Sequence, residues 1–340
     1  MLAMTLSQDD RRLIEDTGKR AHDLRAELSK RIVGLEGPIE QLLCAVLCEG
    51  HSLLVGVPGL AKTLLISSIA EALSLDFRRI QFTPDLMPSD ITGTTVIGQD
   101  RATGERSFVF APGPIFANLL LADEINRTPP KTQAALMEAL EERQVTAAGE
   151  KHPLPRPFFV LATQNPIEQE GTYQLPVAQL DRFMFMINVD YPSFDDEYRV
   201  MRLTTSSYAS KLETVFTREE ILKLQELVRR IEVSDPLIRY AMALARRSRS
   251  DSGVAPAFVR EWLSWGGGPR ATQCLLLGAR ARAMLDGRAQ ATPADVRAVA
   301  PSVLRHRIML SYHAEAESLV PDEIIQELLD TTPSPDGVGV

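Results

Sequence analysis

The sequence predicts an α/β protein in which a parallel sheet flanked by helices carries a phosphate-binding loop, followed by a smaller, all-helical domain. Three observations lead to this fold class. An apolar run, a glycine-containing loop and a helical pattern follow one another over residues 52–73. Two later apolar runs, residues 119–122 and 157–163, end in polar side chains, as strands do at the ligand-binding edge of an open parallel sheet. Beyond residue 192, apolar residues recur at helical spacing through most of the chain.

The N-terminal part of the chain reads as helical. Residues 7–30 are polar with apolar residues at helical spacing, which predicts one or two amphipathic helices, and a further helix is expected through residues 39–47. Ile32 and Val33 lie between these helices, ahead of the phosphate-binding loop. They could line a pocket for adenine or belong to the ordinary core, and the sequence favours neither reading.

The predicted phosphate-binding loop consists of Gly56, Val57, Pro58, Gly59, Leu60, Ala61, Lys62 and Thr63, and Leu64 continues into the helix that follows. Glycines let backbone N–H groups point at phosphate oxygens, and the helix start adds partial positive charge there. We expect Lys62 to reach the β- and γ-phosphates and the Thr63 hydroxyl to bind Mg²⁺. Ala61 stands where the usual pattern has glycine, and we expect it to adopt the helical geometry of a first turn.

Two β-hairpins interrupt the alternation of strands and helices. After a second strand at residues 76–82, two β-prone runs flank a polar turn and predict a hairpin within residues 94–112. A second, smaller hairpin is expected at residues 145–156, following a helix over residues 132–142.

Polar side chains at the ends of two buried strands are candidate catalytic groups. Asp123 and Glu124 follow one strand, and we expect Asp123 to hold the hydration shell of Mg²⁺ and Glu124 to polarise the attacking water as general base. Asn165 ends the next strand, where it could orient the lytic water or sense the γ-phosphate. A plain Asn-Pro turn would explain Asn165 equally well.

Two arginines near the boundary between the domains are further candidates. Arg182 adjoins the last predicted strand, so that it either forms a structural ion pair or projects to a neighbouring subunit's γ-phosphate as an arginine finger. Arg270 lies in the first turn of a helix, where the helix dipole disfavours a cation unless an anionic ligand is near. A plain surface arginine is the alternative. The helices predicted beyond the boundary are residues 195–206, 217–230, 235–250, 269–286 and 293–301.

Composition and charge restrict the function classes. The 340 residues, 44% hydrophobic and 24% charged, are typical of a soluble protein of two domains. No apolar run is long enough for a membrane span, and the first residues lack the pattern of a signal peptide, so we expect a cytoplasmic protein without membrane insertion. Three cysteines fit a reducing compartment, and Cys44 and Cys48 are expected in the core rather than at a metal. The net charge of −8 argues against nucleic acid as the main partner.

Five stretches together resemble the MoxR family of AAA+ ATPases, in the helix-2-insert clade: residues 56–63, 82–93, 121–127, 162–173 and 180–183. In this family the phosphate-binding loop usually carries the alanine seen at Ala61. The resemblance implies an AAA+ P-loop NTPase core followed by an all-α lid domain. The implied divisions are an N-terminal helical segment (1–30), the core (31–192) with both hairpins inserted, the lid (193–330) and a disordered tail (331–340).

The resemblance also implies roles for the candidate residues. The expected motifs are Walker A at residues 56–63, Walker B at Asp123 and Glu124, sensor 1 at Asn165, sensor 2 at Arg270 and the arginine finger at Arg182. Arg127 and Arg143 are alternative fingers, since both are expected near the same subunit edge. In this clade the lid is displaced, so that Arg270 can act on its own nucleotide or on a neighbour's.

The family implies ATP and Mg²⁺ as cofactors and a ring, most often a hexamer, with the hairpins facing its pore. Its members often act with von Willebrand factor A (VWA)-domain proteins in maturing enzymes or inserting metal cofactors. A Mg²⁺-dependent ATPase that remodels protein partners is therefore the first reading. A nucleic-acid motor related to helicases, and a nucleotide-dependent scaffold with little turnover, are the alternatives.

Overall fold

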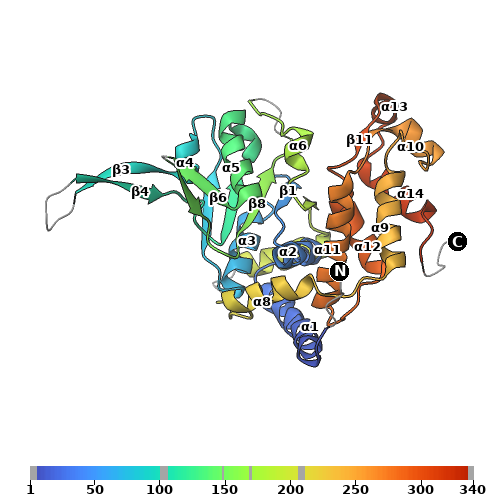
Figure 1. Cartoon of the computed structure of the whole chain (residues 1–340), viewed down its shortest axis with the longest axis horizontal. Coiled ribbons are helices and arrows are strands. Elements are labelled where there is room, and N and C mark those ends of the chain that lie inside the picture. The colour runs from blue at the N-terminus through green and yellow to red at the C-terminus, as the bar shows by residue number, and fades with distance from the viewer. Residues whose placement is uncertain (1–5, 100–105, 148, 168–170, 206–210, 336–340) are drawn as a thin grey trace.

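A computed structural model of the chain describes residues 6–99, 106–147, 149–167, 171–205 and 211–335. It shows a five-stranded parallel sheet at one end and a group of helices at the other, as Figure 1 shows. The strand order is β2-β5-β8-β1-β9. The strands are β1 (Ser52–Gly56), β2 (Phe77–Gln81), β5 (Leu119–Asp123), β8 (Phe159–Gln164) and β9 (Phe185–Val189).

Helices cover both faces of this sheet because its central strands are apolar at nearly every position. Alternate residues point to opposite faces: Leu119 and Leu121 of β5 join one core cluster, and Leu120 joins the other. The first cluster contains residues of α1 (Gln8–Leu28), α2 (Glu36–Leu47) and α3 (Lys62–Ala72). The second contains residues of α5 (Pro130–Glu142). The expected α/β core is therefore confirmed.

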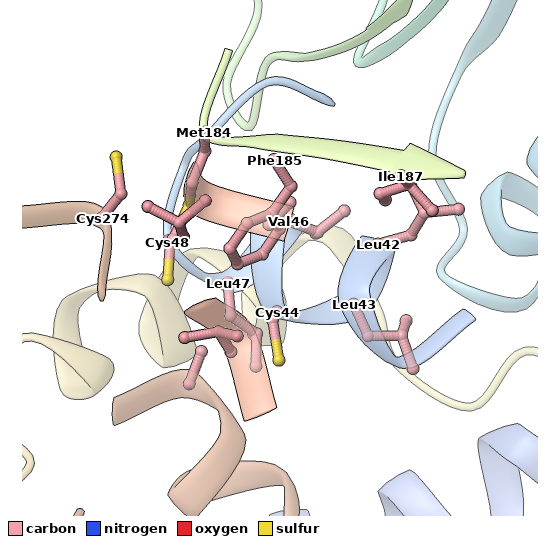
Figure 2. Close-up of a cluster of buried hydrophobic side chains, with 14 of the residues drawn as sticks. Leu42, Leu43, Cys44, Val46, Leu47, Cys48, Met184, Phe185, Ile187 and Cys274 are labelled. Atoms are coloured by element: carbon pink, nitrogen blue, oxygen red, sulfur yellow. The ribbon is translucent and has the colours of Figure 1, made fainter. Parts of the chain in front are cut away.

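The first cluster continues from the sheet into the C-terminal helices. Figure 2 shows side chains of α2, including Leu42 and Val46, packed against Phe185 and Ile187 of β9. Cys44, Cys48 and Cys274 are buried here as free cysteines, as expected for the first two. No group of three or more metal-ligating His, Cys, Asp or Glu side chains occurs in the described part of the chain.

Two antiparallel hairpins leave this core. The longer pairs β3 (Gly93–Gln99) with β4 (Arg106–Pro112), follows α4 (Pro88–Thr92), and projects far from the body in Figure 1. The shorter pairs β6 (Gln144–Ala147) with β7 (Glu150–Pro153) directly after α5. The His152 ring stacks on Phe110 of β4, with ring centroids 3.9 Å apart, so the two hairpins are in contact.

The region after residue 192 is mainly helical. Its helices are α7 (Phe194–Thr204), α8 (Arg218–Val228), α9 (Asp235–Arg247), α10 (Ala257–Trp262), α11 (Pro269–Leu285), α12 (Pro293–Leu304), α13 (Tyr312–Ala316) and α14 (Pro321–Thr331). This region also contains a short antiparallel pair that the sequence did not predict: β10 (Leu263–Trp265) pairs with β11 (Met309–Leu310).

The helical region is attached to the core rather than separate from it. Gln225 of α8 donates a hydrogen bond of 2.7 Å to the carbonyl of Val46 in α2, and α11 packs on α1 and α2. Of the residues expected in a disordered tail from 331, Thr331 ends α14 and Thr332 is buried; residues 336–340 lie outside the described part. Within the described residues, the helices are all too short or too polar to cross a bilayer.

Candidate functional site

The sequence-predicted polar residues gather at the carboxyl edge of the sheet. Strand register places Gln81 of β2 beside Asp123 of β5, and Val55 of β1 beside Gln164 of β8. The phosphate-binding loop, the acidic pair and Asn165 each follow one of these strand ends. A ligand at this edge can therefore contact all three.

The loop between β1 and α3 contains left-handed backbone and a close approach to β9, which suit its glycines. Gly59 has a φ of 86°, in the left-handed region, and a Cβ at Gly56 would lie 2.6 Å from the carbonyl oxygen of Val189. The expectation for Ala61 was wrong, because its φ of 52° is left-handed and not helical. This strained backbone is what a glycine would adopt freely. Lys62 Nζ donates to the carbonyl oxygen of Gly56 at 2.5 Å, so the ammonium group lies across the loop.

Asp123 has the surroundings of a carboxylate that shares a cation site. Its Oδ1 accepts a 2.6 Å hydrogen bond from the Thr163 hydroxyl, and its Oδ2 pairs with Arg79 at 2.6 Å. The Asp123 carboxylate thus attracts a positive charge, which the Arg79 guanidinium provides in this structure. Asp123 and the Thr63 hydroxyl, at the start of α3, offer Mg²⁺ the oxygen donors it prefers. Because Mg²⁺ keeps several waters and phosphate oxygens, these two donors fit a metal that binds together with a nucleotide.

Glu124 is held by a partner that sequence reasoning missed. Its backbone is left-handed, with a φ of 57°, and its N–H donates to the Thr163 hydroxyl at 2.9 Å. Gln81 Nε2 donates to Glu124 Oε2 at 2.5 Å, and Arg127 pairs with the same oxygen at 3.2 Å. The general-base candidate is therefore tied to β2. A sequence signal existed in the polar residues of the edge strand β2, but the strand register was needed to interpret it.

The surroundings of Asn165 agree in part with both interpretations from the sequence, a role beside the nucleotide and a plain turn. Its Oδ1 accepts a hydrogen bond from the Ile167 N–H at 3.2 Å, which is the expected turn. It is also 5% exposed and lines a cavity of about 440 Å³ beside Val55 and Gln164. Asn126 lines the same cavity, and its buried Oδ1 has no hydrogen-bond partner among the described residues. This orphaned acceptor fits a cavity that receives a polar ligand or water.

A second, smaller cavity, of about 250 Å³, shares Val55 with the first. Val55, Gly56 and Asn188 contribute to its wall, so it adjoins the phosphate-binding loop. Ile32 is 3% exposed and packs within the first core cluster, which favours the core reading for that residue. Val33 is buried as well, and its contact with adenine stays a prediction.

The arginine candidates are all engaged within the chain. Arg127 pairs with Glu124, and Arg143 pairs with Glu49 at the opposite, amino edge of the sheet. Burial and nearby arginines lower the pKa of Arg143.

Arg182 and Arg270 come together at the junction of core and helical region. Arg182 pairs with Glu141 of α5 at 2.8 Å. Arg270 lies 3.8 Å from Glu141 and 3.3 Å from Asp181. Sequence reasoning missed both carboxylates, because Glu141 reads as an ordinary surface residue of an amphipathic helix.

Comparison with known proteins agrees with this geometry. The model of the ATPase family associated with various cellular activities (AAA) matches residues 51–185, and the AAA lid domain matches residues 257–328. Chaperone MoxR1 of Mycobacterium tuberculosis is 42% identical over 310 residues, 91% of this chain and 81% of the relative. Protein MoxR of Paracoccus denitrificans is 32% identical over 340 residues, 95% and 98% of the two chains. The crystal structure of a presumed ATPase from Cytophaga hutchinsonii superposes with a TM-score of 0.85 at 38% identity, covering 95% and 96%.

Proposed function

The chain belongs to the MoxR family of AAA+ ATPases, and from this premise we propose that it is a Mg²⁺-dependent ATPase that remodels or matures protein partners. We propose further that ATP is hydrolysed at the subunit interfaces of a ring, expected to be a hexamer. The observation that carries the enzymatic part is the meeting of the loop at residues 56–63, Asp123, Glu124 and Asn165 at one sheet edge.

Each residue at this edge has a chemical task in the proposal. The loop N–H groups and Lys62 hold the phosphates, while Thr63 and Asp123 hold Mg²⁺, which neutralises charge on the phosphoryl oxygens. Glu124 takes the proton of the attacking water as general base. In the structure Gln81 donates to Glu124 Oε2, so a water that takes this position must displace Gln81.

The distribution of cations supports the proposed ring. Charge on the γ-phosphoryl group in the transition state calls for a cation beyond Lys62 and Mg²⁺. Arg182 is 31% exposed, and its partner Glu141 is half-exposed at the junction of core and lid. The Arg182 side chain can therefore leave Glu141 and reach a neighbouring subunit. A finger supplied in this way makes turnover depend on assembly.

The β3–β4 hairpin supports a protein as the partner. Val96 pairs with Val109 and Ile97 with Phe108, so that neighbouring pairs place apolar side chains on opposite faces of the ribbon. These four side chains are 43–79% exposed. An exposed apolar ribbon is typical of a surface that binds apolar segments of another protein. The acidic balance of the chain does not favour nucleic acid.

The location and the adaptor of the protein are part of the proposal. Three free, buried cysteines suit a reducing compartment, and we therefore propose a cytoplasmic location. By analogy with the family, we propose that a VWA-domain protein serves as adaptor and that the remodelled partner receives a metal cofactor.

The decisive experiment is ATPase rate against protein concentration, combined with mixing of two variants. Arg182→Ala keeps a complete phosphate site and Glu124→Gln keeps the finger, so the mixture should regain turnover that neither variant has alone. Arg12→Ala, an exposed arginine of α1, is the control and should behave as wild type. Full activity of Arg182→Ala would refute the finger, and full activity of Glu124→Gln would refute the general base. Light scattering on the same samples gives the ring size.

A second experiment tests the protein partner. Reduced, carboxymethylated α-lactalbumin serves as an unfolded protein probe, and we expect it to stimulate the ATPase. Phe108→Ser should abolish the stimulation and keep the basal rate, because Phe108 lies on the projecting hairpin, away from the sheet edge. Stimulation by single-stranded DNA instead would favour a nucleic-acid motor. Tight ATP binding without phosphate release by assembled wild type would favour a scaffold.

A further inference from the structure

A continuous chain of ion pairs links the two arginines to the helical lid. Arg182 pairs with Glu141, Glu141 with Arg270, Arg270 with Asp181, and Asp181 with Arg307. The chain alternates between positive and negative side chains. It joins the end of α5 in the core to the start of α11 and the residues after α12 in the lid.

Its two ends differ in rigidity. Arg307 is 3% exposed and donates to the carbonyl oxygens of Asp181 and Phe183 at 3.0 and 2.7 Å, besides its 2.7 Å ion pair with the Asp181 carboxylate. This buried end is fixed by several charge-assisted hydrogen bonds. Arg182 and Glu141, at the other end, are 31% and 50% exposed. The chain is therefore anchored at Arg307 and can rearrange at Glu141.

Glu141 divides its two carboxylate oxygens between the arginines. Oε2 lies 2.8 Å from Arg182, and Oε1 lies 3.8 Å from Arg270. Among the described residues, Glu141 is the one carboxylate that pairs with Arg182, whereas Arg270 also has Asp181. Loss of Arg182 would leave the charge of Glu141 entirely to Arg270.

We propose that Glu141 is a positioning residue that couples the arginine finger of a subunit to the lid of the same subunit. In the isolated subunit it holds Arg182 and keeps a long contact with Arg270. When Arg182 turns to the γ-phosphate of a neighbour, Glu141 closes on Arg270 and fastens the lid to α5. The nucleotide state of one subunit thereby sets the lid of the next. This inference rests on the proposed role of Arg182 as a finger in trans.

The strength of the pair suits a reversible device. Glu141 and Arg182 are both partly exposed, and ion pairs between exposed side chains are weak. The pair therefore shifts the equilibrium between bound and released Arg182 by only a small factor. A γ-phosphate carries more negative charge and competes successfully. From the usual range for exposed pairs, removal of the Glu141 charge should ease finger release about two- to fivefold.

The first test separates assembly from turnover. Glu141→Gln keeps the shape of the side chain and removes its charge, and Glu138→Gln, one turn earlier on the exposed face of α5, is the matched control. We expect Glu141→Gln to lower the protein concentration for half-maximal ATPase about two- to fivefold, because the 2.8 Å pair with Arg182 that it loses is shorter than the 3.8 Å contact with Arg270; kcat at saturation is measured alongside. Glu138→Gln should match wild type. An unchanged concentration dependence for Glu141→Gln would overturn the holding role.

The second test measures the lid directly. Spin labels on Lys131→Cys of α5 and Arg239→Cys of α9 report the distance between core and lid; the native cysteines are buried, so they should not react. Without nucleotide, Glu141→Gln should broaden the distance distribution because the contact with Arg270 is lost. With an excess of unlabelled Glu124→Gln subunits and ATP, wild-type labelled subunits should narrow their distribution, and subunits that also carry Glu141→Gln should not.

The outcomes distinguish the two proposals. If Arg182→Ala retains full ATPase, the finger assignment fails, and the nucleotide-free distances still show whether Glu141 holds the lid. If Arg182→Ala is inactive but Glu141→Gln matches wild type in concentration dependence and in both distance measurements, the finger stands and the coupling through Glu141 is refuted.

Discussion

Acid should destabilise the protein through His51, which is buried at the start of β1, next to β8. The ring accepts a 3.0 Å hydrogen bond from the Val160 N–H of β8 at Nδ1, and Nε2 lies 3.2 Å from the Leu140 carbonyl of α5. This pairing requires a neutral ring with its proton on Nε2. Burial lowers the pKa of His51 from 6.5 to about 4.

The sign and size of the effect follow from this pKa. Between pH 6.5 and 4 the unfolded chain takes up a proton at His51 that the folded chain does not. The free energy of unfolding is therefore highest above pH 6.5 with respect to His51, and it falls as the pH is lowered. A difference of about 2.5 pH units, at about 1.4 kcal/mol per unit, gives a loss of roughly 3 kcal/mol by pH 4. Burial and Arg307 lower the pKa of His306 as well, which adds in the same direction.

The assay is urea unfolding at a series of pH values from 8 to 4.5. His51→Gln cannot titrate, so its free energy of unfolding should fall less steeply below pH 6.5 than that of wild type, whatever its absolute stability. The carboxylates titrate in both proteins and cancel in the comparison. His22→Gln, at an exposed position of α1, should keep the wild-type slope. Equal slopes for wild type and His51→Gln would refute the reasoning.

Three further substitutions test the site and its support. Lys62→Ala should lose ATP binding in a fluorescent-nucleotide titration, and retained binding would contradict the phosphate-loop assignment. Thr163→Val removes the hydroxyl that donates a hydrogen bond to Asp123, so we expect the free energy of unfolding to fall by about 1–3 kcal/mol and the ATPase to need more Mg²⁺. Thr163→Ser keeps a hydroxyl and should restore both properties. Gly18→Ala places a Cβ 2.5 Å from the Gly287 nitrogen and should lower the unfolding free energy by about 1–3 kcal/mol, measured by urea unfolding, with no loss of ATP binding.

The sheet was predictable because each of its buried strands is a short apolar run with a distinct polar end. Asp123 and Asn165 could be placed at one edge from that pattern alone, since parallel strands end on the same side. The pair β10–β11 was not predictable, because strands of three and two residues carry no periodicity and pair across some 45 residues of chain. The position of a polar residue relative to a strand end is local information, and strand pairing is not.

The backbone of the phosphate-binding loop shows the same limit at a single residue. Ala61 reads as a helix former, and intrinsic propensity places it in the first turn. The structure gives it a left-handed backbone instead, at the point where the loop after β1 turns into α3. Alanine tolerates this conformation at a cost of roughly 1–2 kcal/mol, which the surrounding packing offsets.

The partners of the candidate residues bear on the proposed dependence of turnover on assembly. Arg79 pairs with Asp123, Gln81 donates to Glu124, and Glu141 pairs with Arg182, so three groups to which we assign roles in hydrolysis already have partners within the chain. Mg²⁺, the lytic water and a neighbour's phosphate would each replace one of these partners. Because every replacement exchanges one polar contact for another, the net free energy of each is small. The order in which the partners are exchanged can then set the order of nucleotide binding, assembly and hydrolysis.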